Sequence, residues 1–236
     1  MANETDRFGL PLLQSAQAQK HVTVNEALMR LDGLVNLTLQ STETLSPPDV
    51  VVNGQCWAVP LGATGAWQGE AGQIAIGSNG GWSYVTPQIG MRAFVADRAV
   101  QSFFNGTNWM DGALSVGSLG SGLMNGIAEA DVTVQPGATF NTRVVIPANV
   151  MVIGVTAKVL TSLTGTMTSW QLGTEGANNR FGSGLGISKG SYGNGLLGSP
   201  MTYYNEANLI MGAQGGSFTG GKVRLGVHWL RLHVPN

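Results

Sequence analysis

The sequence is short of charge. Asp, Glu, Lys and Arg make up 11% of its 236 residues, against about a quarter in an average domain, and the net charge is -1. Nucleic acids and anionic membrane surfaces select clusters of Lys and Arg, so we expect neither as a partner. A surface with so few solvated charges favours coverage by other subunits, and we expect a homo-oligomer.

Cysteine and long apolar runs are also scarce. Cys56 is the single cysteine, so no disulfide can form within the chain, and its place beside Trp57 predicts a buried thiol. No apolar run reaches the length of a membrane span, and the opening MANETDRFG lacks the basic and apolar regions of a signal peptide. We therefore expect synthesis in the cytoplasm without a signal peptide.

Glycine, in contrast, is abundant. The 35 glycines show no collagen period and suit many tight turns between short strands, which predicts a mainly β fold. Pro47-Pro48 and the small residues from Gly112 suggest boundaries. The expected organisation is an N-terminal anchor segment with an amphipathic helix (1–47), a small antiparallel β domain (48–111), a Gly/Ser linker (112–127) and a β-sandwich (128–236).

Residues 10–37 carry the clearest helical pattern. Thr23 is a suitable N-cap and Glu26 stands where a capping box places a carboxylate, so the helix is predicted to begin at Val24. Apolar residues then recur at spacings of three and four: Val24, Ala27, Leu28, Leu31 and Val35. Because such a stripe needs a partner, we expect it to be an assembly interface.

Turn signals divide the rest of the chain into strands. Asn79-Gly80 and Asn105-Gly106 predict hairpins, because both residue types tolerate positive φ. Residues 222–229 alternate with the period of two that places one face of a strand on a core. Seven or eight such strands in the last roughly 105 residues predict a β-sandwich of jelly-roll type.

Three features invite a metal or catalytic interpretation, and each has a simpler one. His228 and His233 are five residues apart on one strand, so they point to opposite faces. The glycine string from Phe181 lacks the Lys-Ser/Thr pair and the βαβ context of a phosphate loop. His21 stands at the start of the helical segment near Glu26, which is explained as a cap. We expect no metal and no cofactor.

A polysaccharide-degrading enzyme is one alternative, and it would need two carboxylates roughly 5–10 Å apart. The available carboxylates are Asp111, Asp131, Glu175 and Glu206. Each lies in or beside a predicted turn, where acidic residues commonly form turns and keep the surface soluble. The sequence therefore predicts no enzyme.

Aromatic side chains offer different chemistry, because sugar rings stack on Trp and Tyr while Asn, Gln and Asp bind sugar hydroxyls. The candidates are Trp82, Tyr84, Trp109 with Asn108 and Asp111, and Tyr203-Tyr204-Asn205. The alternative for Trp82 and Trp109, which follow hairpin turns, is that they close a core. Consecutive tyrosines face opposite ways in a strand, so one is expected to be exposed. The predicted carbohydrate contacts are Tyr203, Tyr204, Asn205 and Trp109.

Several segments of the chain carry a recognisable signature: residues 10–37, LPLLQSAQAQKHVTVNEALMRLDGLVNL, then GATGAW from Gly62, GQIAI from Gly72 and GMRAFVAD from Gly90. In these segments the chain resembles an uncharacterised family of alphaproteobacterial prophage and gene-transfer-agent proteins. The C-terminal part looks like the β-domain that often follows, with IPANVMVIGVTAKV, TSWQLG, NRFGSGLGI and GGKVRLGVHWLRL.

The resemblance implies a virion component on the surface of a phage-like particle, made in the bacterial cytoplasm, and brings no site residues. It implies a head-spike base that aids adhesion to host capsular polysaccharide and contacts capsid proteins and a spike fibre protein. A head-spike base at a capsid vertex would be a pentamer. The alternative is a carbohydrate-binding tail-fibre receptor-binding protein, which would be a trimer.

Overall fold

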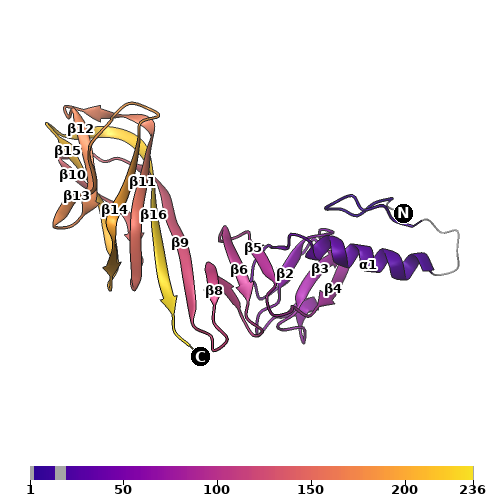
Figure 1. Ribbon diagram of the computed structural model, residues 1–236. Helices are drawn as coiled ribbons and strands as arrows, with labels where there is room; N and C mark the ends of the chain where they lie inside the picture. Colours follow the sequence, from indigo (N-terminus) through magenta and orange to yellow (C-terminus); the bar gives the residue numbers. More distant parts are fainter. Residues whose placement is uncertain (1–2, 14–19, 236) are drawn as a thin grey trace. The chain divides into compact units, whose positions relative to one another are not determined.

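The computed structural model describes residues 3–13 and 20–235, with no account of the side chains of residues 20 and 21. The chain divides into two compact units, residues 1–113 (unit 1) and residues 114–236 (unit 2). The described residues are mainly in strands, with the helix near the N-terminus, which confirms the predicted fold class (Figure 1). No helix in the described ranges is long and apolar enough to cross a membrane.

The described part of unit 1 combines the helix α1 (Lys20–Leu34) with a mixed seven-stranded sheet of order β4-β3-β2-β1-β5-β6-β7. The strands are β1 (Thr38–Leu39), β2 (Cys56–Ala58), β3 (Ile74–Ser78), β4 (Gly81–Val85), β5 (Arg92–Val95), β6 (Val100–Phe104) and β7 (Trp109–Asp111). Strand β1 pairs in parallel with β2 and β5, whereas the other pairs are antiparallel. Two antiparallel meanders are therefore joined through β1.

Both predicted hairpin turns are present in unit 1. Asn79 (φ 52°) and Gly80 (φ 78°) have the positive φ of a two-residue turn between β3 and β4. Asn105 lies between β6 and β7, where its Oδ1 accepts hydrogen bonds from the amides of Thr107 (2.9 Å) and Asn108 (2.8 Å). Local turn chemistry thus sets both connections.

The sheet of unit 1 has an apolar cluster on each face. Ile74 and Ile76 belong to one cluster and Ala75, between them on β3, belongs to the other, as alternation requires. The first cluster consists of Leu37, Leu39, Cys56, Ala58, Ile74, Ile76 and Ala93. The second consists of Val59, Trp67 and Ala75, with Trp57, Trp82 and Tyr84 packed against it.

Helix α1 begins at Lys20, so the predicted N-cap at Thr23 is wrong. Lysine is a good helix former, and the local capping signal at Thr23 does not stop the helix there. The C-terminal end of α1 lies close to β3, because Gly33 faces Ile76. A Cβ at Gly33 would lie 2.9 Å from two Ile76 carbons and 3.3 Å from Cys56 Sγ, so a larger residue would push the helix away.

The described part of unit 2 folds into two sheets, β10-β15-β12-β13 and β14-β11-β16-β9-β8. The strands are β8 (Ala113–Val116), β9 (Gly122–Thr133), β10 (Thr139–Ile146), β11 (Val150–Gly165), β12 (Ser169–Thr174), β13 (Ala177–Leu185), β14 (Tyr192–Tyr203), β15 (Ala207–Gln214) and β16 (Phe218–His233). Strand β9 pairs with β16, β10 with β15, β11 with β14 and β12 with β13. This nested pairing is a jelly roll.

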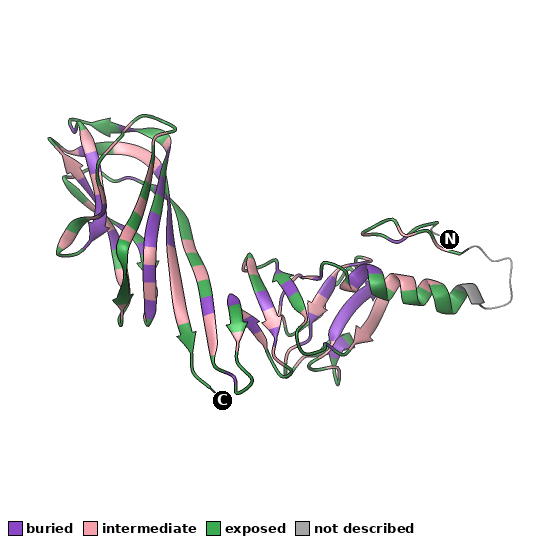
Figure 2. Cartoon of the chain, viewed as in Figure 1, coloured by how far each residue is buried: buried purple, intermediate pink, exposed green. Residues whose placement is uncertain are grey.

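One core fills the space between the two sheets of unit 2. Along β16, Val223, Leu225 and Val227 are fully buried on the core side, as the sequence pattern predicts, while Arg224 is exposed and Gly226 is buried between its neighbours on the other face. Trp170 and Met211 contribute from the other sheet. Figure 2 shows buried positions alternating with half-buried or exposed ones along β11.

The expected domain boundaries differ from the compact units. The first 47 residues supply β1, which lies in the middle of the unit 1 sheet, so they are not separate from residues 48–111. Residues 112–127, expected to be a linker, contain β8 and the first half of β9. Pairing with β16, a distant strand, satisfies the backbone of this glycine-rich segment, and local composition carries no sign of it.

Candidate functional site

The N-terminal segment, residues 3–13, is held on α1 through Asp32. This carboxylate is 1% exposed and accepts hydrogen bonds from Thr5 Oγ1 (2.7 Å) and from the amides of Arg7 (2.9 Å) and Phe8 (2.8 Å). Asn25 makes a second attachment, because its side chain bonds both the amide and the carbonyl of Leu13, at 2.9 and 3.0 Å. The polar face of α1 is therefore occupied within the chain.

Arg7 caps the C-terminal end of the same helix. Its guanidinium donates to the carbonyl oxygens of Asp32 (2.6 Å), Gly33 (2.8 Å) and Asn36 (3.0 Å). These carbonyls have no partner within a helix, and a cation suits the negative end of the helix dipole. This contact could not be predicted from the sequence, because nothing in the local pattern links Arg7 to residues 25 to 29 positions later.

The predicted assembly interface remains uncovered in the single chain. We call Val24, Ala27, Leu28, Leu31 and Val35 the α1 stripe. Val24 (41%), Leu31 (49%) and Val35 (41%) are exposed, as is Ala27, while Leu28 is half-buried. In Figure 2 the buried positions of α1 are confined to its C-terminal end. The helix thus rests on unit 1 through Asp32 and Gly33, and its apolar side faces outward.

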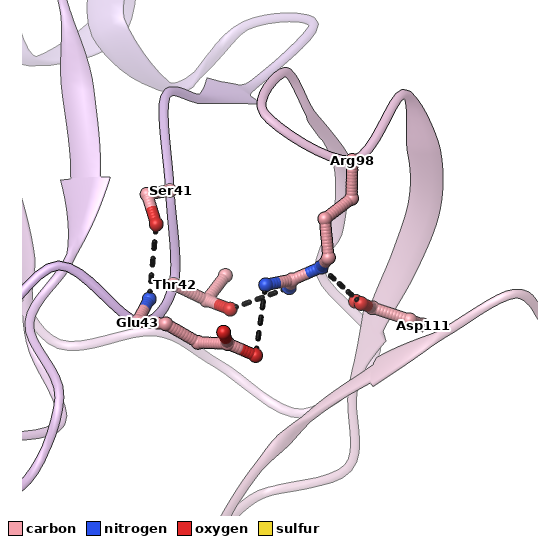
Figure 3. A network of polar contacts seen from close by, with 5 residues as sticks. All are labelled: Ser41, Thr42, Glu43, Arg98 and Asp111. Atoms are coloured by element: carbon pink, nitrogen blue, oxygen red, sulfur yellow. Dashed lines mark hydrogen bonds and ion pairs between the residues drawn. The ribbon is translucent and has the colours of Figure 1, made fainter.

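Asp111 has a structural partner. Arg98, in the turn between β5 and β6, bonds Asp111 Oδ2 through Nε at 2.7 Å, Thr42 Oγ1 at 2.7 Å and Glu43 Oε1 at 2.9 Å (Figure 3). The Glu43 amide in turn donates to Ser41 Oγ at 3.1 Å. This network ties the segment after β1 to the end of β7, which accounts for the carboxylate without catalysis.

The four predicted carbohydrate contacts have different environments. Tyr204 is 76% exposed, and Asn205 is exposed beside it in the turn after β14. Tyr203 is half-buried and packs against the core of unit 2, so one tyrosine of the pair is exposed, as predicted. Trp109 belongs to unit 1 and packs against its first cluster, with the Phe104 ring 5.2 Å away. The structure does not bring the four residues into one site.

Trp82 and Tyr84 also pack within unit 1. The Trp82 ring meets Trp67 edge-on at 5.2 Å, which confirms the core interpretation for this residue. Tyr84 donates to the Ala66 carbonyl at 2.5 Å, and burial, followed by the charge of Glu70, raises its pKa. Both aromatic residues line a cavity of about 770 Å³ between the N-terminal segment, α1 and β3–β4.

The outer face of the larger unit 2 sheet carries a group of polar residues that the sequence analysis did not assemble. Register places Tyr192, Lys158, Arg224 and Asp131 in one row across β14, β11, β16 and β9. The next row consists of Asn194, Thr156, Gly226 and Glu129. These residues, except Asp131, line an open groove of about 360 Å³, which we call the outer-sheet groove.

Asp131, on β9, forms ion pairs with two cations of β16. Arg224 contacts it in bidentate fashion at 2.6 and 3.2 Å, and Lys222 Nζ lies 3.2 Å away. Hydrogen bonds from Arg224, then from Lys222, lower the pKa of Asp131 to about 2. Asp131 is therefore ionised at neutral pH and cannot act there as a general acid.

The remaining candidates do not form a catalytic or metal site. His228 Nε2 lies 3.0 Å from Thr156 Oγ1, and register places His228 and His233 on opposite faces of β16. Residues 181–185 of the glycine string are part of β13, Glu175 lies in a turn, and Glu206 lies in the connection between β14 and β15. Within the described residues no three His, Cys, Asp or Glu side chains group together as metal ligands. The side chain of His21 lies outside the described residues.

The outer-sheet groove could be found only in part from sequence. The alternation of β16 already places Arg224 and Gly226 on the outer face. No local signal places Tyr192 and Lys158 beside them. Strand β11 pairs with β16, and β14 pairs with β11, across long stretches of sequence. The missing information is the pairing of strands distant in sequence.

Comparison with known proteins gives one family match. Residues 24–110 match a family described as "Protein of unknown function (DUF2793)". The matched range runs from α1 to β7 and so corresponds to unit 1 without its N-terminal segment. No curated protein matches the chain.

Two solved structures show limited similarity. The first is entitled "Cyanophage Pam1 capsid asymmetric unit", with 20% identity and a TM-score of 0.35 over 50% of this chain and 91% of the other. The second is the "Acidic stable capsid structure of Helicobacter pylori bacteriophage KHP30", with 16% identity and a TM-score of 0.36 over 48% of this chain and 96% of the other. TM-scores this low support no conclusion about function.

Proposed function

We propose that this chain is a structural component of a phage-like particle, either a gene transfer agent or a prophage. In this proposal it forms a head-spike base that helps the particle adhere to host surface polysaccharide. The α1 stripe is the observation that carries the proposal. It presents apolar side chains to solvent on a helix whose polar side is already bound within unit 1.

An exposed apolar stripe on a helix is typical of a surface that binds another protein. Its exposure is consistent with an anchor that packs against sister chains or capsid proteins. The sequence resemblance supports the same proposal, since it begins at residues 10–37, which include α1.

The fold of unit 2 is compatible with the outward half of such a component. Double-sheet jelly rolls occur in viral capsid and lectin domains, although a fold alone does not define a function. Asp111 and Asp131 are both engaged in ion pairs, which favours a role without catalysis. The alternative of a carbohydrate-binding tail-fibre protein shares these features and differs in symmetry, a trimer in place of a pentamer.

The test is the mass of the purified full chain by multi-angle light scattering, with a variant of the stripe. We expect an oligomer for the wild type and a monomer for Leu31→Glu, because a charge on the stripe opposes burial. Leu61→Glu is the matched control, since Leu61 is 89% exposed in unit 1 outside α1. A pentamer supports the spike base and a trimer supports the tail fibre.

The same variants, tagged and expressed in a particle-producing strain, report association with purified particles. We expect the wild type and Leu61→Glu to co-sediment with particles and Leu31→Glu to stay in the supernatant. A monomeric wild type, or a Leu31→Glu variant that assembles normally, would overturn the anchor role. Shortening of a host polysaccharide by the purified chain would instead favour the degrading enzyme.

A further inference from the structure

The floor of the outer-sheet groove is formed by neighbouring strands of the larger unit 2 sheet. Four neighbouring strands, β14, β11, β16 and β9, lie side by side in Figure 1, and at the usual strand spacing they span about 14 Å. Gly226 is buried at the centre of the floor, where a Cβ would lie 3.0 Å from Thr156 Oγ1. A larger residue there would fill the hollow between its neighbours.

One wall of the groove is aromatic. Tyr192 is 79% exposed, although it stands in a strand that pairs with β11, and no hydrogen bond holds its hydroxyl among the described residues. Asn194 follows two positions later on the same face and is also exposed. An exposed ring beside an amide and the hydroxyl of Thr156 suits a sugar, which offers one apolar face and several hydroxyl groups.

Two charged groups of the groove make no ion pair within the described residues: Lys158 on β11, and Glu129 on β9, which stands in the next row and two strands away. Arg224 is paired with Asp131, which Lys222 also contacts. Lys158, between Tyr192 and Arg224 in the same row, makes no ion pair within the described part of the chain. An uncommitted ammonium beside an exposed aromatic ring favours a ligand that carries an anionic group as well as an apolar face.

We propose that the outer-sheet groove binds a polysaccharide that carries carboxylate groups. Tyr192 stacks on a sugar ring, Lys158 binds the carboxylate, and Asn194 and Thr156 bind hydroxyl groups. The proposal deepens the attachment role proposed above and rests on it, and it places the contact away from the predicted Tyr203 and Tyr204. The groove volume of about 360 Å³ lies near the lower end of the range for small-ligand sites.

The test is affinity gel electrophoresis of the full chain in gels that contain polygalacturonate, with dextran as the neutral comparison. We expect polygalacturonate but not dextran to retard the wild type. Tyr192→Ala and Lys158→Gln should each weaken binding about tenfold, the loss expected for one charge-assisted contact or one stacked ring. Arg143→Gln removes an equal charge from β10, in the other sheet, and Tyr204→Ala removes the other exposed tyrosine; both should bind as the wild type does.

Several results would overturn the proposal. These are equal binding by Lys158→Gln and the wild type, equal losses in Lys158→Gln and Arg143→Gln, equal retardation by dextran, or no retardation at all. A loss in Tyr204→Ala alone would place the site at the end of β14. The binding measurement is independent of the oligomer masses of the wild type and Leu31→Glu. Failure of the glycan site is therefore distinguishable from failure of the assembly role.

Discussion

Asp32 is the residue around which the N-terminal segment is ordered. Helical periodicity assigns it to the solvent side of α1, opposite the apolar stripe. The structure buries it, because three donors from residues 5–8 surround its carboxylate. A buried carboxylate is acceptable only with such partners, so the segment and the helix depend on each other.

Asp32→Ala should therefore cost stability. The substitution leaves the Thr5 hydroxyl and the amides of Arg7 and Phe8 without an acceptor, and we expect a loss of about 2–3 kcal/mol in the free energy of unfolding. Urea unfolding followed by tryptophan fluorescence measures it. Asp49→Ala, at an exposed position, is the control. Equal stability of the two variants would show that the carboxylate is not structural.

Cys56 gives a pH-dependent prediction at the same scale. Burial raises the pKa of the thiol from 9.0 to about 12. The positive charge of Arg7 lowers this pKa to a smaller extent, and the negative charge of Asp32 raises it further. The folded state thus favours the neutral thiol, so its contribution to stability is complete below pH 9 and is lost as the pH rises from 9 to 12.

The measurement is the free energy of unfolding from pH 8 to 11, for the wild type and Cys56→Ala. The wild type should lose stability more steeply above pH 9 than Cys56→Ala, since the two proteins differ only in the thiol. Iodoacetamide at pH 8 should label Cys56 only after unfolding, because the thiol is 0% exposed. Rapid labelling of the native protein would contradict the burial.

At the scale of elements, the signals found in sequence were the local ones. The Asn79-Gly80 and Asn105-Gly106 hairpins and the alternation along β16 depend on neighbouring residues, and the structure has all three. Strand β1 has only two residues and joins two meanders by parallel pairing. No local sequence pattern predicts this strand or its pairing. The exposed side of α1 follows likewise from contacts of Arg7 and Gly33 with distant segments.

Because β1 lies at the centre of its sheet, its small size does not make it dispensable. Leu39 is 0% exposed, and we expect Leu39→Ala to lower the free energy of unfolding of unit 1 by about 3 kcal/mol. Leu61→Ala, at a position 89% exposed, should change it by less than about 0.5 kcal/mol. Chemical denaturation measures the free energy of unfolding of both variants. Similar losses would show that Leu39 contributes no more to the core than an exposed residue.

At the scale of the whole molecule, each unit has its own core, made of two clusters in unit 1 and one in unit 2. The clusters of unit 1 draw on residues 37–76 and 93, and the core of unit 2 draws on residues 132–227. The jelly roll was predictable as a class from the number and alternation of strands. The outer-sheet groove was not, because its residues come from β9, β11, β14 and β16 and meet only through long-range register.

The two cores should unfold as separate transitions in scanning calorimetry. We expect Leu39→Ala to lower one midpoint by roughly 10 °C and leave the other in place. Leu172→Ala, at a position 1% exposed in unit 2, should act on the other transition alone. A single transition that moves with both substitutions would show that the units unfold together.

The nested pairing of unit 2 has a consequence for how the chain is made. Strand β16 lies between β9 and β11, so the larger sheet stays split until the last of its strands has left the ribosome. The register joins Thr133 to Lys222 and Gly122 to His233, contacts that close slowly because the intervening chain is long. During that interval β9 and β11 have open edges, where nascent copies can pair wrongly. Translation speed over residues 134–217 would then govern the yield of soluble protein.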